Sequence, residues 1–331
     1  MTNRNLYFDF LRGVAIIMVI GIHCYTIDNN ILFRQVLNAA VPLFIAVSGF
    51  FLSQKVIKDR DQYVVFWRKQ IPKVYVPTLF WSLPLLILAV YRGVGIGKSI
   101  VNFFSCGFSI YYFIVFIIQC YLILPFVLRL ESKYNKIMWG SSLMSIIWVG
   151  LMVRLTVIEG ISLPIVVYAG PLPCWFMFFM LGIILGKYSV RNYSLWWPIL
   201  ITICGLVLSS VSAKYLLYVY HSGVGIKPTA FVYAFGLILF LFNVKIENFI
   251  KKENFIYKQI VWIGSISFPI YLVHMYILGF VVSKMSISSW SLRIIITVIL
   301  TSMLIVVLKK IIPNNLHHYI GQYFGKFLPK D

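Results

Sequence analysis

The stretch DFLRGVAIIMVIGIHCY, residues 9–25, lies in an apolar run at 7–27 and contains both an arginine and a histidine. Arg12 and His23 are eleven residues apart. On an α-helix this spacing is about three turns, or about 16 Å, so both side chains project from one face. Ionisable groups inside hydrocarbon are costly and normally face a bundle interior or a wet cavity. The stretch therefore predicts a membrane helix with a functional site. The alternative is that Arg12 extends to the interface and His23 lies among lipid headgroups.

The composition of the 331-residue chain indicates a membrane protein. Hydrophobic residues make up 61%, aromatic residues 17% and charged residues only 11%, and the mean hydropathy is +0.90. Charged residues approach a quarter of a typical soluble domain. The first apolar run has a short n-region, two ionisable residues and no small-residue cleavage site. We therefore expect a retained first span rather than a cleaved signal peptide.

Ten apolar runs are long enough, or nearly long enough, to cross about 30 Å of hydrocarbon as helices. They lie at 7–27, 36–56, 74–91, 109–129, 137–155, 172–187, 195–216, 229–244, 260–282 and 290–311. The run at 172–187 is short, and the Gly/Pro-rich stretch after 155 is a candidate re-entrant segment, so nine or eleven spans are alternatives. We predict one all-α, polytopic membrane domain over 1–331, with about ten transmembrane helices around a buried cavity.

The distribution of basic residues tests this count. With ten spans, both termini and every second loop share one side of the membrane, and that side carries twenty Lys and Arg residues against eight on the other. The twenty are Arg4, Lys55, Lys58, Arg60, Arg68, Lys69, Lys73, Arg129, Lys133, Lys136, Lys187, Arg191, Lys245, Lys251, Lys252, Lys258, Lys309, Lys310, Lys326 and Lys330; the eight are Arg34, Arg92, Lys98, Arg154, Lys214, Lys227, Lys284 and Arg293. Cytoplasmic loops carry the excess of basic residues. Both termini are therefore predicted to be cytoplasmic in the cell's inner (plasma) membrane.

The net charge of +20 is thus mostly a topology signal, aided by attraction to anionic lipid headgroups. No basic and aromatic pattern on a soluble module indicates nucleic acid. The cysteines show no metal-ligand spacing, so we expect small apolar fillers and no metal site.

RGVGIGKS at 92–99 resembles a phosphate-binding loop, but Arg92 stands where its first glycine belongs, and the predicted topology puts it on the outer side. We interpret it as a loop.

A second candidate site is the basic segment KVIKDRDQYVVFWRKQIPKVYVP, residues 55–77. Lys69 and Lys73 are spaced i and i+4, with Arg68 beside them, so a helix would present the three as one basic face at the membrane surface. One interpretation is topology and headgroup binding. The other is a dock for an anionic cytoplasmic cofactor, because clustered Arg and Lys bind phosphates.

The two sites together suggest one mechanism. If the first span enters from the cytoplasm, Arg12 lies in the inner part of the bilayer and His23 in the outer half. A donor with a long arm, such as coenzyme A, would bind its phosphates on the basic face and deliver its reactive end deep into the bundle. His23 would then deprotonate an acceptor hydroxyl as a general base.

Five segments resemble acyltransferase family 3 in the same order along the chain. They are the first run with its Arg and His, VPLFIAVSGFFLS at 41–53, YYFIVFIIQCYLILP at 111–125, WFMFFMLGIILGK at 175–187 and GSISFPIYLVHMYIL at 264–278. The family consists of integral-membrane enzymes that move acyl groups, commonly acetyl from acetyl-CoA, onto hydroxyls of cell-surface glycans and related acceptors. The resemblance implies the stand-alone form, without an appended extracytoplasmic domain.

The resemblance also implies roles for individual residues. His23 matches the family's essential histidine, and Arg12 matches its paired arginine, which orients the buried end of the donor. The family's R-x-x-R pair, taken to contact coenzyme A, falls here on Gln70 and Lys73, with Arg68 and Lys69 just upstream. The basic character is kept while the bidentate arginine at the first position is lost, and Lys does not replace Arg at such sites.

Several weaker candidates complete the predicted site. His274 reaches the depth of His23 and is predicted either to bind the acceptor or to hydrogen-bond a neighbouring helix. Tyr112, Gln119 and Tyr271 are candidates for lining the acceptor site, with interfacial aromatic belts as the alternative for the tyrosines. Asp9, one turn before Arg12, is expected to pair with it. Further assignments are close helix packing for Ser48 and Gly49, a lining position or an interfacial belt for Tyr111, and no chemistry for His221, His317 and His318.

Two functions remain open from the sequence. The first is an acyl-CoA-dependent O-acyltransferase, with acetyl-CoA as co-substrate and a surface glycan or lipid-linked sugar as acceptor. The second is a multispan exporter or flippase of glycan intermediates, in which Arg12 and His23 would line the substrate path. The basic face favours the first, because an exporter needs no site for coenzyme A.

Overall fold

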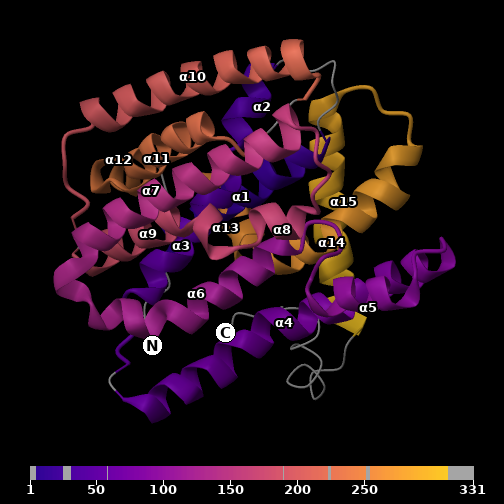
Figure 1. The fold of residues 1–331 in the computed structure, drawn as a ribbon, viewed down its shortest axis with the longest axis horizontal. Helices are drawn as coiled ribbons and strands as arrows, with labels where there is room; N and C mark the ends of the chain where they lie inside the picture. Colours follow the sequence, from indigo (N-terminus) through magenta and orange to yellow (C-terminus); the bar gives the residue numbers. More distant parts are fainter. Residues whose placement is uncertain are drawn as a thin grey trace.

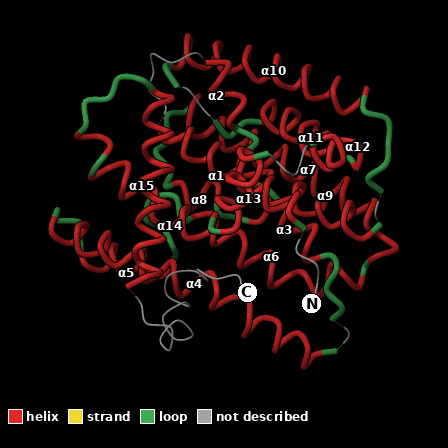
Figure 2. The backbone as a smooth tube through the Cα atoms, turned by 180° about the vertical axis from the view of Figure 1, so that it is seen from behind, coloured by secondary structure: helices red, strands yellow, loops and turns green. Residues whose placement is uncertain are grey.

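The computed structural model describes residues 5–24, 31–57, 59–188, 190–222, 225–250 and 254–311, and these residues form helices with no strand. The α-helices are α1 Leu6–Cys24, α2 Ile31–Leu37, α3 Ala40–Leu52, α4 Arg60–Tyr91, α5 Ile96–Phe104, α6 Tyr112–Arg129, α7 Tyr134–Val153, α8 Ile165–Ala169, α9 Phe176–Lys187, α10 Trp196–Tyr220, α11 Pro228–Phe242, α12 Val244–Phe249, α13 Phe255–Ser265, α14 Ser267–Phe280 and α15 Trp290–Ile311. α10 runs along one edge of the bundle and α4 along the opposite edge, with α1 and α3 between them (Figures 1 and 2).

Eight helical stretches are long and apolar enough to cross a membrane, and α9 and α11 are shorter apolar helices. The all-α polytopic class is therefore confirmed, and each of the ten predicted runs overlaps a helix. The number of crossings and the side on which the termini lie stay predictions. The predicted positions 25–27, Arg4, Lys58, Lys251, Lys252, Lys326, Lys330, His317 and His318 lie outside the described residues.

The helix that contains the predicted third span begins earlier than that span. The span was expected at 74–91, after a charged and then amphipathic segment, but α4 is one helix of 32 residues that contains Pro72, Pro77 and Pro84. Asp59 starts it early, because its side chain accepts a hydrogen bond of 2.8 Å from the backbone N–H of Gln62 and so caps the helix. Prolines are tolerated inside membrane helices when neighbouring groups satisfy the freed backbone.

The predicted ninth span at 260–282 is also different in the structure. It consists of α13 and α14, which are separated by a break at Ile266. α13 packs against α1, whereas α14 contacts α15, α1 and α4. The break therefore allows one apolar run to contribute to two different parts of the bundle.

Glycines set two close helix contacts. A Cβ on Gly264 of α13 would lie 1.8 Å from the carbonyl oxygen of Asp9 on α1. A Cβ on Gly49 of α3 would lie 2.4 Å from the carbonyl oxygen of Phe179 on α9. Both distances are far inside van der Waals contact, so only glycine permits these backbones to approach. The expected packing role of Gly49 is confirmed.

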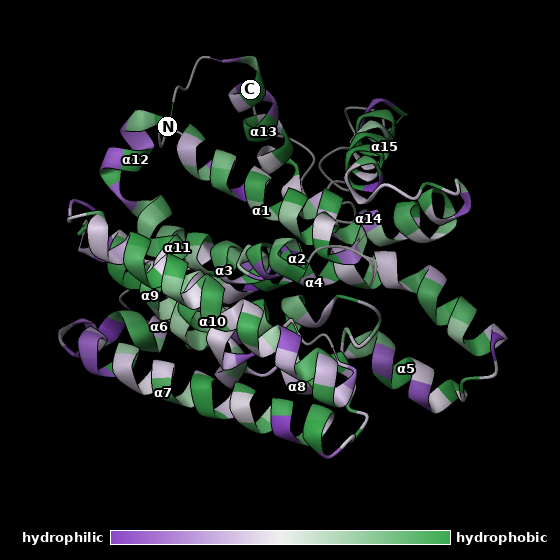
Figure 3. Cartoon of the chain, turned by 90° about the horizontal axis from the view of Figure 1, so that it is seen from above, coloured by the Kyte–Doolittle hydropathy of each residue, from purple (hydrophilic) through white to green (hydrophobic). Residues whose placement is uncertain are grey.

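The outer surface of the bundle is strongly apolar. Large side chains such as Ile87 on α4, Ile147 on α7 and Val211 on α10 are more than half exposed. Figure 3 shows hydrophobic residues along most of the long helices, with hydrophilic residues gathered on α12, α5 and the helix ends. A surface of this kind suits contact with lipid.

Candidate active-site cavity

A cavity of about 470 Å³ lies inside the bundle, and both Arg12 and His23 line it. α1 is unbroken from Leu6 to Cys24, so the two side chains stand about three turns, or about 16 Å, apart on the same helix. Their predicted projection from one face into a shared space is confirmed. The rest of the lining comes from α2, α3, α4, α6, α8, α11 and α14 and from connecting segments between helices.

Contacts with Asp9 and Phe51 hold Arg12 in place. Its Nη1 donates to Oδ1 of Asp9 at 3.0 Å, and its guanidinium carbon lies 4.8 Å from the centroid of the Phe51 ring. The side chain of Asp9 is 4% exposed and that of Arg12 is 34% exposed. The expected ion pair is therefore present. Its acid is buried, whereas the arginine side chain is partly exposed.

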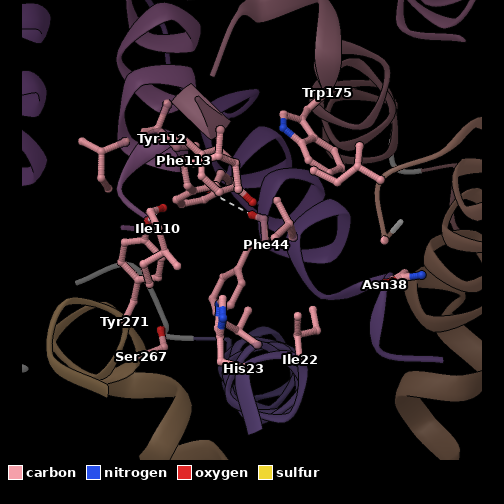
Figure 4. A pocket seen from close by; sticks show the side chains of 18 of the residues that line it. Ile22, His23, Asn38, Phe44, Ile110, Tyr112, Phe113, Trp175, Ser267 and Tyr271 are labelled. Atoms are coloured by element: carbon pink, nitrogen blue, oxygen red, sulfur yellow. Dashed lines mark hydrogen bonds between the residues drawn. The ribbon is translucent and has the colours of Figure 1, made fainter. Parts of the chain in front are cut away.

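His23 stands at the opposite end of α1 and is half-buried. Figure 4 shows it on α1 with Ile22, among Phe44, Tyr271 and Ser267. His274 on α14 does not line the cavity, but its ring centroid lies 5.6 Å from that of His23. The planes of the two rings are inclined by 45°. The imidazole therefore lines the cavity among mainly apolar and aromatic groups.

Tyr112 and Tyr271, both predicted site residues, line the cavity. The hydroxyl of Tyr271 donates to the carbonyl oxygen of Ile110 at 2.5 Å, and the hydroxyl of Tyr111 donates to that of Leu272 at 2.7 Å. This reciprocal pair fastens the start of α6 to α14. The ring of Tyr271 thus forms part of a cavity wall that hydrogen bonds hold together. Contact of Tyr112 or Tyr271 with an acceptor stays a prediction.

Gln119 and His274 do not line this cavity. The amide nitrogen of Gln119 donates to the carbonyl oxygens of Val115 and Gly170, and its Oε1 accepts from the N–H of Leu172 at 2.9 Å. Its described contacts therefore hold the 170–172 loop against α6. His274 is 0% exposed and lies behind the cavity wall.

The basic face lies beside the cavity but does not line it. Arg68 and Lys69 are exposed on α4, and the half-buried Lys73 donates to Oε1 of Gln70 at 3.5 Å. On one side of this segment, the indole N–H of Trp67 donates to the carbonyl oxygen of Tyr121 at 2.8 Å, and Tyr121 lines the cavity. On its other side, Val74 lines the cavity directly. The basic residues are thus flanked by the cavity wall.

The cavity lining includes residues that the predicted site did not contain, among them Arg34, Asn38, Tyr168 and Trp175. Two indoles hold α8, because Trp148 donates to the carbonyl oxygen of Tyr168 at 2.9 Å and Trp175 to that of Ala169 at 2.8 Å. The Gly/Pro-rich stretch after 155 was a signal for irregular backbone at membrane depth. Nothing in its pattern indicated which residues would face the cavity.

A second cavity of about 530 Å³ adjoins the first. Both are lined by Arg34, Tyr168, Gly225 and Ile226, and the second also by His221. Because α2 follows the end of α1, Arg34 belongs to the His23 end of the first cavity. The shared residues therefore mark where the two cavities meet, at the end remote from Arg12.

Near this junction, Gln35 organises a buried polar network. Its Oε1 accepts hydrogen bonds from Asn38 at 2.8 Å, from Ser209 at 2.9 Å and from Nζ of Lys227. Gln35 is 1% exposed and Lys227 is 2% exposed. The network joins α2, α10 and the start of α11, and it orients Asn38 at the cavity edge.

The fold and the cavity together define a class of protein: an integral-membrane helical bundle with an arginine and a histidine of one helix in a shared internal cavity. A family model for the Acyltransferase domain matches residues 5–309, and the chain belongs to that family. It is accordingly consistent with a membrane acyltransferase. The comparisons with curated proteins and with solved structures found no match.

Proposed function

We propose that this protein is a membrane O-acyltransferase that moves an acyl group, chiefly acetyl, from cytoplasmic acyl-CoA to a hydroxyl of a cell-surface glycan or lipid-linked sugar. One observation carries the proposal: Arg12 and His23 of one helix line the same cavity. Apolar surroundings make both groups costly, so their exposure to a shared internal space supports a chemical role.

The donor enters at the Arg12 end. The phosphates of coenzyme A bind the basic face of Arg68, Lys69 and Lys73, and the long arm passes the cavity wall at Val74 and Tyr121. The guanidinium of Arg12 then orients the arm through hydrogen bonds. Arg12 is about 16 Å from His23 along α1, so it acts on the arm of the donor and not on the reacting carbonyl.

The acceptor enters at the other end, from the second cavity past Arg34 and Asn38. His23 removes the proton of the acceptor hydroxyl while the oxygen attacks the thioester carbonyl carbon. A new carbon–oxygen bond forms and the carbon–sulfur bond breaks. The thiolate of coenzyme A leaves and takes the proton from His23, which returns the base to its neutral form.

This reaction needs a protein that spans the inner (plasma) membrane with Arg12 towards the cytoplasm, and so with both termini cytoplasmic. A fluorescent protein that folds only in the cytoplasm, fused after residue 331, should be bright. An alkaline phosphatase fusion at the same place should be inactive, because that enzyme requires the oxidising outer compartment. An active phosphatase would reject this orientation.

The decisive experiment uses surface polysaccharide extracted from cells in which the gene is deleted. Purified protein in lipid nanodiscs is incubated with that polysaccharide and radiolabelled acetyl-CoA. We expect label in the polysaccharide, and a loss of about 10²–10⁴-fold in His23→Ala, the usual contribution of a general base. Movement of glycan across vesicles without acyl transfer would instead support an exporter or flippase.

A further inference from the structure

His274 has a defined tautomer in this structure. Its Nδ1 lies 2.9 Å from the carbonyl oxygen of Tyr271 and 3.1 Å from that of Ile270. Carbonyl oxygens only accept hydrogen bonds, so the ring proton of a neutral His274 is on Nδ1. Its Nε2 consequently carries a lone pair and is an acceptor.

That acceptor is buried and has no hydrogen-bond partner among the described residues. The ring of His274 contacts two other rings, His23 at 5.6 Å and Tyr271 at 6.2 Å between centroids. The hydroxyl of Tyr271 already donates to Ile110. Of these two rings, His23 is therefore the one with an N–H to offer to Nε2 of His274.

On the basis of the proposed function, we propose that His274 is a positioning residue for His23. Its Nε2 accepts a hydrogen bond from one ring nitrogen of His23 and so keeps the His23 proton on that nitrogen. The other nitrogen of His23 then presents its lone pair to the cavity, where the acceptor hydroxyl arrives. A general base that is oriented by a third group is the arrangement of catalytic triads.

The bond to His274 persists through the reaction. When His23 takes the hydroxyl proton, both of its nitrogens become donors. One still donates to His274, and the other donates its new proton to the departing thiolate. A neutral imidazole performs this task without placing a carboxylate in a fully buried, apolar position, where a charge would be costly.

Two amide variants separate this role from a structural one. The side-chain amide of glutamine reaches the position of Nε2, whereas that of asparagine reaches the position of Nδ1. We expect His274→Gln to retain most acetyl transfer. We expect His274→Asn and His274→Leu to lower kcat about 10–100-fold, the usual effect of losing an orienting partner, with the KM for acetyl-CoA nearly unchanged. Rescue by asparagine and not by glutamine would assign His274 to helix packing and overturn the proposal.

A double mutant tests whether His274 acts through His23. In a His23→Ala background, His274→Leu should cause no further loss, because the group that it orients is absent. Additive losses would mean that His274 acts on the substrate independently. All variants are compared by thermal melting in nanodiscs, so that a folding defect is recognised.

A spectroscopic readout is independent of activity and of the His274 variants' folding. Nitrogen-15 NMR of histidine-labelled protein with His221, His317 and His318 replaced by asparagine leaves two histidines. One should show a protonated Nδ1 and an unprotonated Nε2. A spectrum of this triple variant with neither ring in that form would refute the assignment. Absence of acetyl transfer by the wild-type protein would reject the proposed function itself, whereas transfer that depends on His23 but not on His274 would reject only this inference.

Discussion

Asp9 and Arg12 form an ion pair directly behind the point where α1 and α13 touch. Nη1 of Arg12 donates to Oδ1 of Asp9 at 3.0 Å, and the backbone carbonyl of Asp9 lies against Gly264. The side chain of Asp9 thus positions the guanidinium of Arg12, and its backbone packs against α13. Helix packing and orientation of the arginine are coupled at this residue.

Removing the charge of Asp9 should weaken donor binding. Asp9→Asn keeps the size of the side chain but loses the charge-assisted bond that holds Arg12. We expect the KM for acetyl-CoA to rise about tenfold, in the range found for orienting partners. The control is Glu159→Gln, which disrupts an exposed pair with Arg154 at 2.9 Å and should leave KM unchanged. Equal KM values for the two variants would contradict a role of Asp9 in positioning Arg12.

The basic face should matter for the donor and not for the chemical step. We expect Lys69→Ala with Lys73→Ala to raise the KM for acetyl-CoA about tenfold, or about 1.4 kcal/mol, and to lower kcat much less. The effect should shrink at high salt. Lys309→Ala with Lys310→Ala, which removes two exposed lysines of α15, is the matched control. Unchanged donor dependence in the first double variant would reject the docking role.

The contact at Gly264 should not tolerate a methyl group. In Gly264→Ala, the new Cβ would lie 1.8 Å from the Asp9 carbonyl oxygen, so α1 and α13 must separate. We expect a loss of about 1–3 kcal/mol in stability, as for other overpacked sites, together with reduced transfer. Gly140→Ala on α7 is the control, since nothing lies within 4 Å of its Cβ. Thermal melting in nanodiscs measures the stability of both variants. An unchanged Tm in Gly264→Ala would show that this helix contact is not rigid.

Lys227 should make stability depend on pH. Burial, and then the nearby guanidinium of Arg34, lowers the pKa of Lys227 from 10.5 to about 7. Between these values the folded protein binds fewer protons than the unfolded chain, so the stability contribution of this lysine rises with pH from about 7 to 10.5. Below pH 7 the folded state carries the full cost of the buried charge.

Thermal unfolding at pH 6.5 and pH 9 tests this dependence. The Tm of the wild-type protein relative to that of Lys227→Met should be higher at pH 9 than at pH 6.5. Lys214→Met, at an exposed position of α10, should show no such trend. If the Tm difference between wild type and Lys227→Met stays constant from pH 6.5 to pH 9, the pKa of Lys227 is not lowered in the folded protein.

The membrane helices followed closely from the apolar runs where those runs are uninterrupted. α15 begins and ends at the residues predicted, Trp290 and Ile311, because lipid requires a continuous apolar helix. The boundary was less certain for α4. The apolar run predicted a span that begins at residue 74, whereas the cap at Asp59 lets α4 begin at Arg60.

The sequence by itself determined the class of fold and the two ends of the candidate site. Ionisable residues are so costly in hydrocarbon that Arg12, His23 and the pairing of Asp9 with Arg12 were recognisable from residue type and helical spacing alone. Only the tertiary structure decided the walls of the cavity. Trp175 and Tyr168 reach it because glycine contacts and indole hydrogen bonds bring distant segments together. His274 lies beside His23, and Gln119 bonds to the backbone of residues 170–172. Both arrangements depend on contacts between segments that are far apart in sequence. The periodicity of one helix carries no information about such contacts.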